Sequence, residues 1–121
     1  MKERRGAARL EIRADLELDL PGQEHPTLGT TLNISHSGVY FETSYFMEEG
    51  TKLPLIIQLP AGGDEDDDIW AFTQDGIVVR CQPPVEDPKC EAYRVACFFY
   101  DIDEDSRRRL EDYVQRRSSA E

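Results

Sequence analysis

The segment from Arg9 to Leu20 alternates charged and apolar residues without a break. The apolar positions are Leu10, Ile12, Ala14, Leu16, Leu18 and Leu20. Successive side chains of a β-strand point to opposite faces, so this period of two predicts a strand with one buried face. The Pro21-Gly22 pair that follows is typical of a turn, because proline presets φ and glycine tolerates positive φ. The alternation therefore favours a fold built from strands.

Five or six further strands are predicted downstream, each bounded by turn residues. Their ranges are about 27–34, 39–43, 53–59, 69–72, 77–81 and 91–100. Gln74-Asp75-Gly76 separates two of these ranges, so 69–72 and 77–81 form either one bent strand or a tight hairpin, with Asp75-Gly76 as a turn or bulge. The last range is apolar on both faces, which indicates a central strand.

The end of the chain changes to a helical period. An apolar stripe with helical spacing runs through Leu110, Tyr113 and Val114. Asp103 or Asp105 can cap the start of this helix, and Arg116 and Arg117 suit the dipole at its end. We expect the helix over about 104–117. Short sequential strands followed by one helix predict an all-β fold, a small antiparallel barrel or sandwich with a C-terminal α-helix.

Charge is distributed unevenly along the 121 residues, a length typical of one domain. The net charge is -11, yet residues 1–13 carry +3, residues 14–106 carry -16 and residues 107–121 carry +2. We therefore divide the chain into a basic N-terminal arm, 1–9, and a domain, 10–121. The acidic body disfavours DNA or RNA as a partner, because nucleic-acid binding requires clustered bases. A local basic arm still suits a small anionic ligand.

Several other classes of protein lack support in the sequence. No apolar run is long enough to span a bilayer, and no secretory signal opens the chain, so we expect a cytoplasmic protein without membrane insertion. The cysteines at 81, 90 and 97 match no zinc spacing and are expected to be reduced. The acidic run at 61–68 lacks the spacing of a calcium loop and is expected to be a solvated loop. No motif for catalysis is present, so the chain is not expected to be an enzyme.

Two short motifs remain, one on the arm and one at a turn between predicted strands. Arg5 and Arg9 form an RxxxR element just before the first strand. Asn33, Ser35 and Gly38 form an (D/N)xSxxG element at the turn between the second and third strands. In this order and context the pair resembles the PilZ domain, the bacterial receptor module for cyclic di-GMP. The resemblance covers essentially the whole chain and implies a six- to seven-stranded antiparallel barrel in a stand-alone, single-domain member.

The resemblance implies a cyclic di-GMP site at Arg4, Arg5, Arg9, Asn33, Ser35 and Gly38. The guanidinium fork of arginine suits both phosphate oxygens and the O6/N7 edge of guanine. Asn33 meets the donor edge of guanine in this scheme, where the amide offers one acceptor in place of the two of an aspartate. An arginine at position 4, directly before RxxxR, resembles the arrangement that favours an intercalated cyclic di-GMP dimer.

The sequence thus predicts a receptor module that needs no cofactor. Cyclic di-GMP would order the arm against the barrel and change the surface offered to an unidentified downstream protein. An alternative is a PilZ-like protein-interaction module that does not bind nucleotide. An OB-like barrel for single-stranded nucleic acid is disfavoured by the acidic body. No arrangement of candidate catalytic residues in the sequence supports a small hydrolase.

Overall fold

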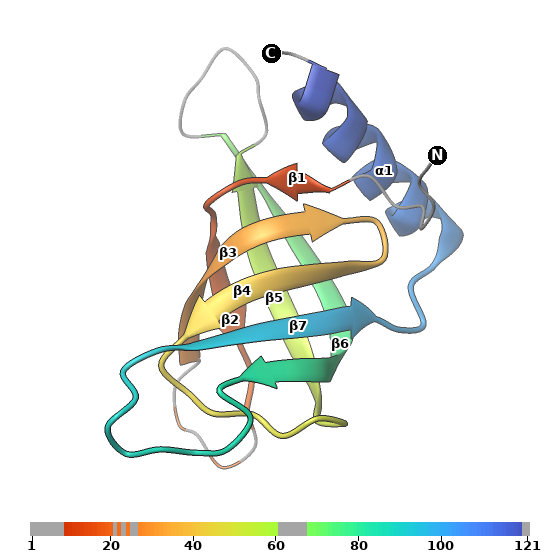
Figure 1. Cartoon of the computed structure of the whole chain (residues 1–121). Helices are drawn as coiled ribbons and strands as arrows, with labels where there is room; N and C mark the ends of the chain where they lie inside the picture. Colours follow the sequence, from red (N-terminus) through yellow and green to blue (C-terminus); the bar gives the residue numbers. More distant parts are fainter. Residues whose placement is uncertain (1–8, 21, 23, 25–26, 61–67, 120–121) are drawn as a thin grey trace, which may run out of the picture.

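The computed structural model describes residues 9–20, 22, 24, 27–60 and 68–119. Within these residues, seven strands precede a single helix (Figure 1). The strands are β1 (Leu10–Glu11), β2 (Asp15–Leu18), β3 (Thr27–Ser35), β4 (Gly38–Thr43), β5 (Lys52–Pro60), β6 (Ile69–Gln82) and β7 (Tyr93–Phe99). The helix is α1 (Glu104–Ser119). The predicted division at residue 9 falls at the edge of the described chain, because residues 1–8 of the arm lie outside it.

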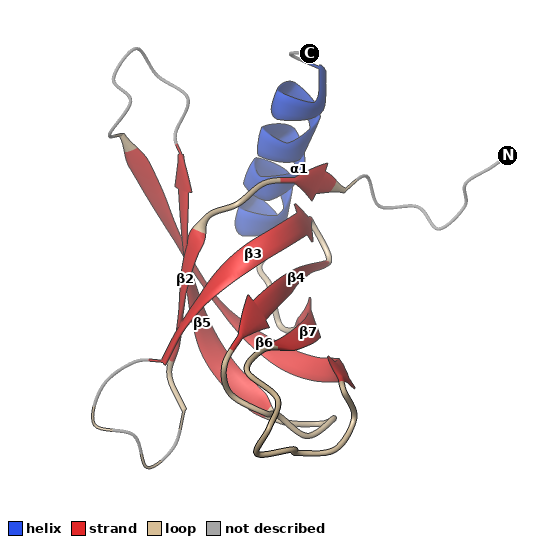
Figure 2. Cartoon of the chain, turned by 60° about the vertical axis from the view of Figure 1, so that its left-hand side comes forward, coloured by secondary structure: helices blue, strands red, loops and turns tan. Residues whose placement is uncertain are grey.

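The strands close into an antiparallel barrel. The sheet order is β1-β3-β2-β5-β6-β7-β4. An additional pairing between β3 and β4 closes the strands from β3 to β4 in this order into a ring. Six of the described strands therefore form the closed barrel, while β1 pairs with β3 outside the ring (Figure 2). This confirms the predicted fold class, an all-β barrel with a C-terminal helix.

The alternating segment forms two strands where the sequence predicted one. Both β1 and β2 pair with β3, β1 near its end and β2 near its start, so they follow one another along the same edge. Between them, the Thr31 hydroxyl accepts a hydrogen bond from the Ala14 amide at 2.8 Å and donates to the Ile12 carbonyl at 2.6 Å. The inward and outward alternation survives the break, because Ala14 is still buried.

Residues 69–72 and 77–81, for which the sequence allowed either one bent strand or a hairpin, belong to the single strand β6. It runs through Gln74-Asp75-Gly76 as one strand of 14 residues, so the single-strand alternative is confirmed and the hairpin alternative is not. Its first part pairs with β5 and its second part with β7, which lets one long strand wrap around the barrel. The irregularity predicted at Asp75-Gly76 lies between Val78 and Arg80 instead.

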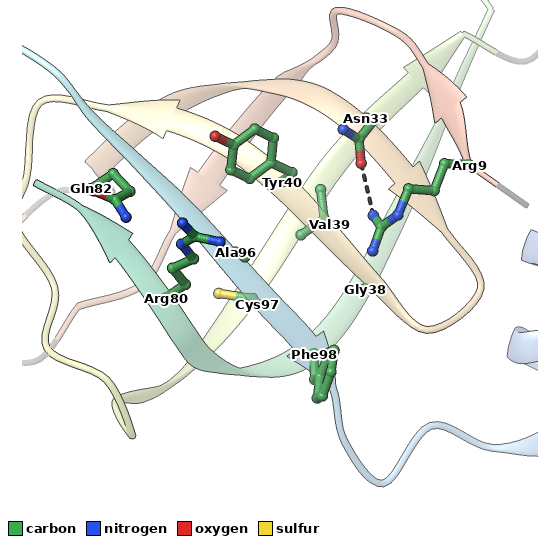
Figure 3. Close-up of a pocket in the computed structure, with 10 residues that line it drawn as sticks. All are labelled: Arg9, Asn33, Gly38, Val39, Tyr40, Arg80, Gln82, Ala96, Cys97 and Phe98. Atoms are coloured by element: carbon green, nitrogen blue, oxygen red, sulfur yellow. Dashed lines mark hydrogen bonds between the residues drawn. The ribbon is translucent and has the colours of Figure 1, made fainter. Parts of the chain in front are cut away.

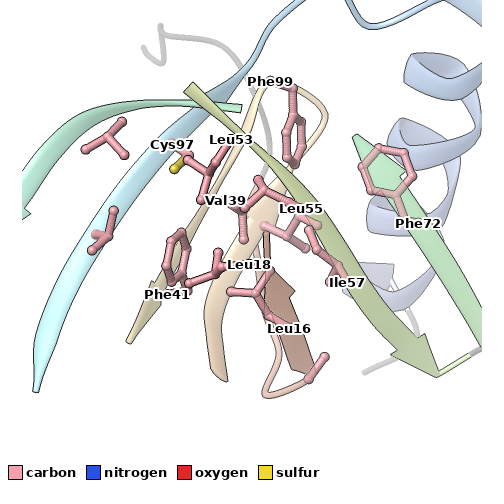
Figure 4. Close-up of a cluster of buried hydrophobic side chains, with 14 of the residues drawn as sticks. Leu16, Leu18, Val39, Phe41, Leu53, Leu55, Ile57, Phe72, Cys97 and Phe99 are labelled. Atoms are coloured by element: carbon pink, nitrogen blue, oxygen red, sulfur yellow. The ribbon is translucent and has the colours of Figure 1, made fainter. Parts of the chain in front are cut away.

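The core fills the barrel interior (Figure 4). On β2, β4, β5 and β7, alternate residues point inward and are buried, as on β5, where they are Leu53, Leu55, Ile57 and Leu59. Strand β7 lies between β4 and β6, so its predicted central position is confirmed. Its outer face, however, is not part of the core, because Phe98 is 53% exposed.

Helix α1 lies beside β1 and β3 at one end of the barrel. Asp103 caps its start, since the carboxylate accepts a hydrogen bond from the Ser106 amide at 2.7 Å. Leu110 and Val114 are buried in the barrel core, as the apolar stripe predicted. The Tyr113 hydroxyl donates to the Pro60 carbonyl at 2.6 Å and ties the helix to the end of β5. No helix in the described part of the chain is long and apolar enough to cross a membrane.

Candidate functional site

A pocket of about 290 Å³ lies on the outer face of the barrel (Figure 3). Strands β3, β4, β7 and β6 form its floor, and the residue before β1 forms one edge. Its lining residues are Arg9, Asn33, Gly38, Val39, Tyr40, Arg80, Gln82, Ala96, Cys97 and Phe98. Segments up to 89 positions apart in the sequence thus meet at one site.

The strand register places four lining residues in one row across the sheet. Asn33 of β3 pairs with Tyr40 of β4, Tyr40 pairs with Ala96 of β7, and Ala96 pairs with Arg80 of β6. Ala96 is the smallest side chain of this row and lies between the tyrosine and the arginine. The pocket therefore has polar groups at its two ends, and the small Ala96 side chain leaves its floor low between them (Figure 3).

Two β-bulges set the direction of the polar side chains at the ends of the row. The β3–β4 register shifts between Thr31 and Asn33, and the β6–β7 register shifts between Val78 and Arg80. Thr31 and Val78 point inward and are buried, so strict alternation would also turn Asn33 and Arg80 inward. The extra residue at each bulge moves them to the outer face instead. The bulges are thus the devices that bring Asn33 and Arg80 to one pocket.

Each arginine of the pocket is hydrogen-bonded to a side-chain amide. Arg9 donates from Nη1 to Oδ1 of Asn33 at 2.8 Å. With the Gln82 amide in the orientation that satisfies both of its groups, its oxygen accepts from Nη2 and Nε of Arg80 at 3.1 and 3.2 Å. These bonds orient both guanidinium groups without neutralising either.

The electrostatics of the pocket follow from these partners. No carboxylate is among the described residues that line it. An ion pair on this face joins Glu42 to Arg94, with 3.9 Å between carboxylate and guanidinium, and neither residue lines the pocket. Two full positive charges therefore face the pocket in a chain whose net charge is -11. Such a site attracts an anion with several acceptor groups.

The structure places the residues predicted from the sequence in three groups. Arg9, Asn33 and Gly38 line the pocket together. Ser35 is fully buried at the β3–β4 turn, where its hydroxyl lies 3.0 Å from the Ser37 hydroxyl and accepts from the Ser37 amide, so it shapes the turn. Arg4 and Arg5 lie outside the described residues.

Sequence reasoning did not assign Tyr40, Arg80, Gln82 or Phe98 to the site. Arg80 and Gln82 lie more than 40 residues after Asn33, and the bulge that turns Arg80 outward has no motif of its own. The one available signal was an arginine at the end of an apolar strand, which is unusual for a strand with a buried face. Phe98 adds an exposed aromatic ring at the rim of the pocket.

The family model of the PilZ domain matches residues 3–116, nearly the whole chain. The chain belongs to the PilZ family. This confirms the resemblance drawn from the RxxxR and (D/N)xSxxG elements, and both motifs of this PilZ domain fall within the matched range. A comparison with curated proteins gave no significant match.

Solved structures share the fold of this PilZ domain. The PilZ domain of YcgR from Escherichia coli, solved with cyclic di-GMP, has a TM-score of 0.67 and 16% identity, with 96% of this chain and 95% of that chain covered. The inhibitor of motility MotI (DgrA) of Bacillus subtilis has a TM-score of 0.73 and 24% identity over 97% of this chain. MrkH, a transcription regulatory factor described as dependent on cyclic di-GMP, has a TM-score of 0.72 and 18% identity over 98% of this chain. This PilZ domain spans about half of MotI and of MrkH, 52% of each.

Proposed function

We propose that this PilZ domain is a receptor module for cyclic di-GMP, and that the nucleotide binds in the outer-face pocket between Arg9 and Arg80. The observation that carries the proposal is the pair of guanidinium groups, each held by an amide and each still cationic. Cyclic di-GMP is an anion with two phosphates and two guanines, and both kinds of group offer acceptors to arginine. The function proposed is binding, and none of the described residues that line the pocket form a nucleophile–base pair.

The apolar groups of the pocket suit the faces of the bases. Ala96 and Gly38 keep the floor low, and the rings of Tyr40 and Phe98 lie on either side of it. Aromatic rings and guanidinium planes both stack on nucleobases, with about 1–3 kcal/mol per stacked base. The site thus combines stacking surfaces with charged donors, as a dinucleotide requires.

The arm supplies the remaining groups in this proposal. Arg4 and Arg5 lie five and four positions before Arg9 in the sequence, close enough in this proposal to contact a nucleotide bound at Arg9. Ordering of the arm over the ligand changes the surface that the domain offers to an unidentified partner protein in the bacterial cytoplasm. An intercalated dimer of cyclic di-GMP would engage Arg4 in addition.

Isothermal titration calorimetry with cyclic di-GMP tests the proposal. We expect the Arg5→Ala, Arg9→Ala and Arg80→Ala variants each to lose about tenfold or more in affinity, since each removes a charge-assisted hydrogen bond. Arg94→Ala is the matched control, because Arg94 lies on the same face but pairs with Glu42 outside the pocket. Its affinity should stay near that of the wild type.

Two further measurements, the binding stoichiometry and the salt dependence of the affinity, test how the nucleotide binds. A stoichiometry of two nucleotides per chain, reduced to one by Arg4→Ala, supports the intercalated dimer. The affinity of the wild type should fall as salt rises, because phosphate contacts are screened. Absence of binding by the wild type, with a folded protein by circular dichroism, would contradict the proposal and favour an interaction module that does not bind nucleotide.

A further inference from the structure

We infer that the open edge of β6, beside α1, binds an extended acidic segment of a partner protein by pairing with it as an added strand. This surface shares no residue with the outer-face pocket, and the inference does not depend on nucleotide binding. Three features carry it: a row of unpaired backbone groups, a groove along that row and an arginine without a carboxylate partner.

The first part of β6 has a neighbouring strand on one side only. Strand β5 pairs with β6 from its first residue onward, whereas the pairing with β7 begins at Gly76. Beyond the end of β7, the Tyr100 amide still donates to the Asp75 carbonyl at 3.1 Å, and the chain then continues into α1. Residues 69–73 therefore form a strand edge within the described part of the chain.

The ladder identifies the backbone groups at this edge. In an antiparallel sheet, successive residues direct their N–H and C=O groups to opposite neighbours in turn. The Val78 amide donates to the Thr51 carbonyl at 2.8 Å on the β5 side, and the Asp75 carbonyl accepts on the β7 side. By this alternation, Ala71 and Thr73 direct their groups away from β5, as Asp75 does. No backbone hydrogen bond among the described residues reaches these groups of Ala71 and Thr73.

A groove of about 250 Å³ follows this edge. Its lining residues are Trp70, Ala71, Phe72, Thr73, Asp105, Ser106 and Arg109. The first four are consecutive on β6 and the other three belong to the first two turns of α1, so the groove runs between the strand edge and the helix. Such a space suits a single extended chain, which an open edge binds through backbone hydrogen bonds.

The charges of the groove favour an acidic segment. Arg109 is exposed, and its guanidinium lies 4.3 Å from the centroid of the Trp70 ring. It forms no ion pair with the described residues, whereas Asp105, the carboxylate of the groove, lies 3.7 Å from the guanidinium of Arg108. One positive charge therefore remains beside the edge, and a carboxylate on the added strand can pair with it.

Amide hydrogen exchange followed by NMR first tests whether the edge is open. In the protein alone, we expect the Ala71 and Thr73 amides to exchange about tenfold or more faster than the amides of Phe72 and Gln74, which face β5. Equal protection of Ala71 and Thr73 would overturn the proposal, because the edge would then be covered by the chain itself or by a second copy of it.

The binding test uses an acetylated peptide of about six residues, the usual length of a strand, with alternating valine and glutamate. We expect this peptide to slow exchange at Ala71 and Thr73. A peptide of alternating valine and lysine should bind about fivefold or more weakly. The valine–glutamate peptide methylated at every backbone nitrogen cannot donate to the edge and should not bind. Absence of protection by the unmethylated peptide, or equal binding of the methylated one, would overturn the proposal.

Proline at position 71 removes one donor of the edge. Because the Ala71 N–H faces away from β5, Ala71→Pro leaves the ladder with β5 intact and should weaken the valine–glutamate peptide about tenfold or more. Ala71→Ser keeps the donor and should bind as the wild type does. Thr73→Pro repeats the test at the next outward amide if Ala71→Pro does not fold. Unchanged affinity in a folded proline variant would contradict pairing at this edge.

Arg109→Gln tests the preference for an acidic segment. This variant should lose the preference for the glutamate peptide over the lysine peptide, since the uncompensated charge is gone. Arg108→Gln is the matched control, because Arg108 is an exposed arginine of the same helix that pairs with Glu104 and does not line the groove. It should keep the preference. A preference that survives in Arg109→Gln would show that this arginine does not select the partner, which overturns the assignment of an acidic segment.

Discussion

A Cβ atom on Gly38 would collide with the carbonyl oxygen of Cys97 on the neighbouring strand. The two residues lie next to each other in the β4–β7 ladder, where Gly38 pairs with Phe98 and Val39 pairs with Cys97. The glycine of the (D/N)xSxxG element therefore has a structural role, since it lets β4 approach the backbone of β7 at the floor of the pocket. This role adds to its position on the pocket lining.

Substitution at Gly38 should accordingly lower stability. We expect Gly38→Ala to reduce the free energy of unfolding by about 1–3 kcal/mol, because the added methyl group meets backbone atoms that cannot move aside. Gly76→Ala is the matched comparison, since its Cβ would meet the end of the flexible Leu55 side chain and should cost less. Urea denaturation of both variants measures the difference. Equal losses would argue against the backbone collision.

The Thr31 hydroxyl should be essential where the chain leaves β1 and enters β2. Thr31→Val keeps the shape but removes a hydroxyl that is fully buried and bonded to Ile12 and Ala14, so the Ala14 amide loses its acceptor. We expect a loss of about 1–3 kcal/mol in the free energy of unfolding. Thr31→Ser retains the hydroxyl and should recover much of it. Thermal unfolding with both variants provides the measurement, and equal melting temperatures would refute the role of the hydroxyl.

Ala96 offers a way to block the pocket without disturbing the fold. Its side chain lies on the outer face between Tyr40 and Arg80, so Ala96→Leu should fill the centre of the pocket. We expect the affinity for cyclic di-GMP to fall by about tenfold or more, with little change in melting temperature. Ala71→Leu is the control, an exposed position on β6 outside this pocket. Unaltered affinity in Ala96→Leu would place the nucleotide elsewhere.

Alkaline pH should destabilise the barrel through a buried thiol. Burial raises the pKa of Cys97 from 9.0 to about 12. Since the folded state holds the proton more tightly than the unfolded state, stability is fully present below pH 9 and is lost as pH rises toward 12. We expect a decrease of about 2 kcal/mol in the free energy of unfolding between pH 8.5 and about pH 11. In Cys97→Ala the decrease should be smaller, and an identical profile would exclude this thiol as its source.

The barrel could be predicted from the sequence because the alternation of apolar and charged residues shows which side chains are buried. The parity of residues 9–20 predicted the inward set correctly, even though the backbone divides into β1 and β2. The division itself was not predictable, since it depends on the Thr31 hydroxyl, 17 positions away from Ala14. The sequence left a bent strand and a hairpin open at Asp75-Gly76. The strand forms because pairing with β5 and β7 along its length outweighs the local turn preference of these residues.

Only those residues of the site that belong to a sequence motif could be predicted. The two short elements located Arg9, Asn33 and Gly38, which do meet at the pocket. The position of Arg80 in the site could not be predicted, because alternation from Val78 would place its side chain inside the barrel. Only the bulge turns this side chain to the outer face. A bulge depends on pairing between strands distant in sequence, so neither its position nor its effect can be derived from local spacing.

The position of β1 outside the ring separates the attachment of the arm from the folding of the barrel. Because β2, β3 and β4 close the barrel without it, β1 can detach from β3 while every other pairing remains intact. Its two register pairs, Leu10 with Ile34 and Glu11 with Asn33, form a small cooperative unit with its own opening free energy. In the proposed function, a ligand that bridges Arg9 and Asn33 would act on this local equilibrium. Such a change would reach α1 through the contacts of β1 with the helix, while the six strands of the barrel stay paired.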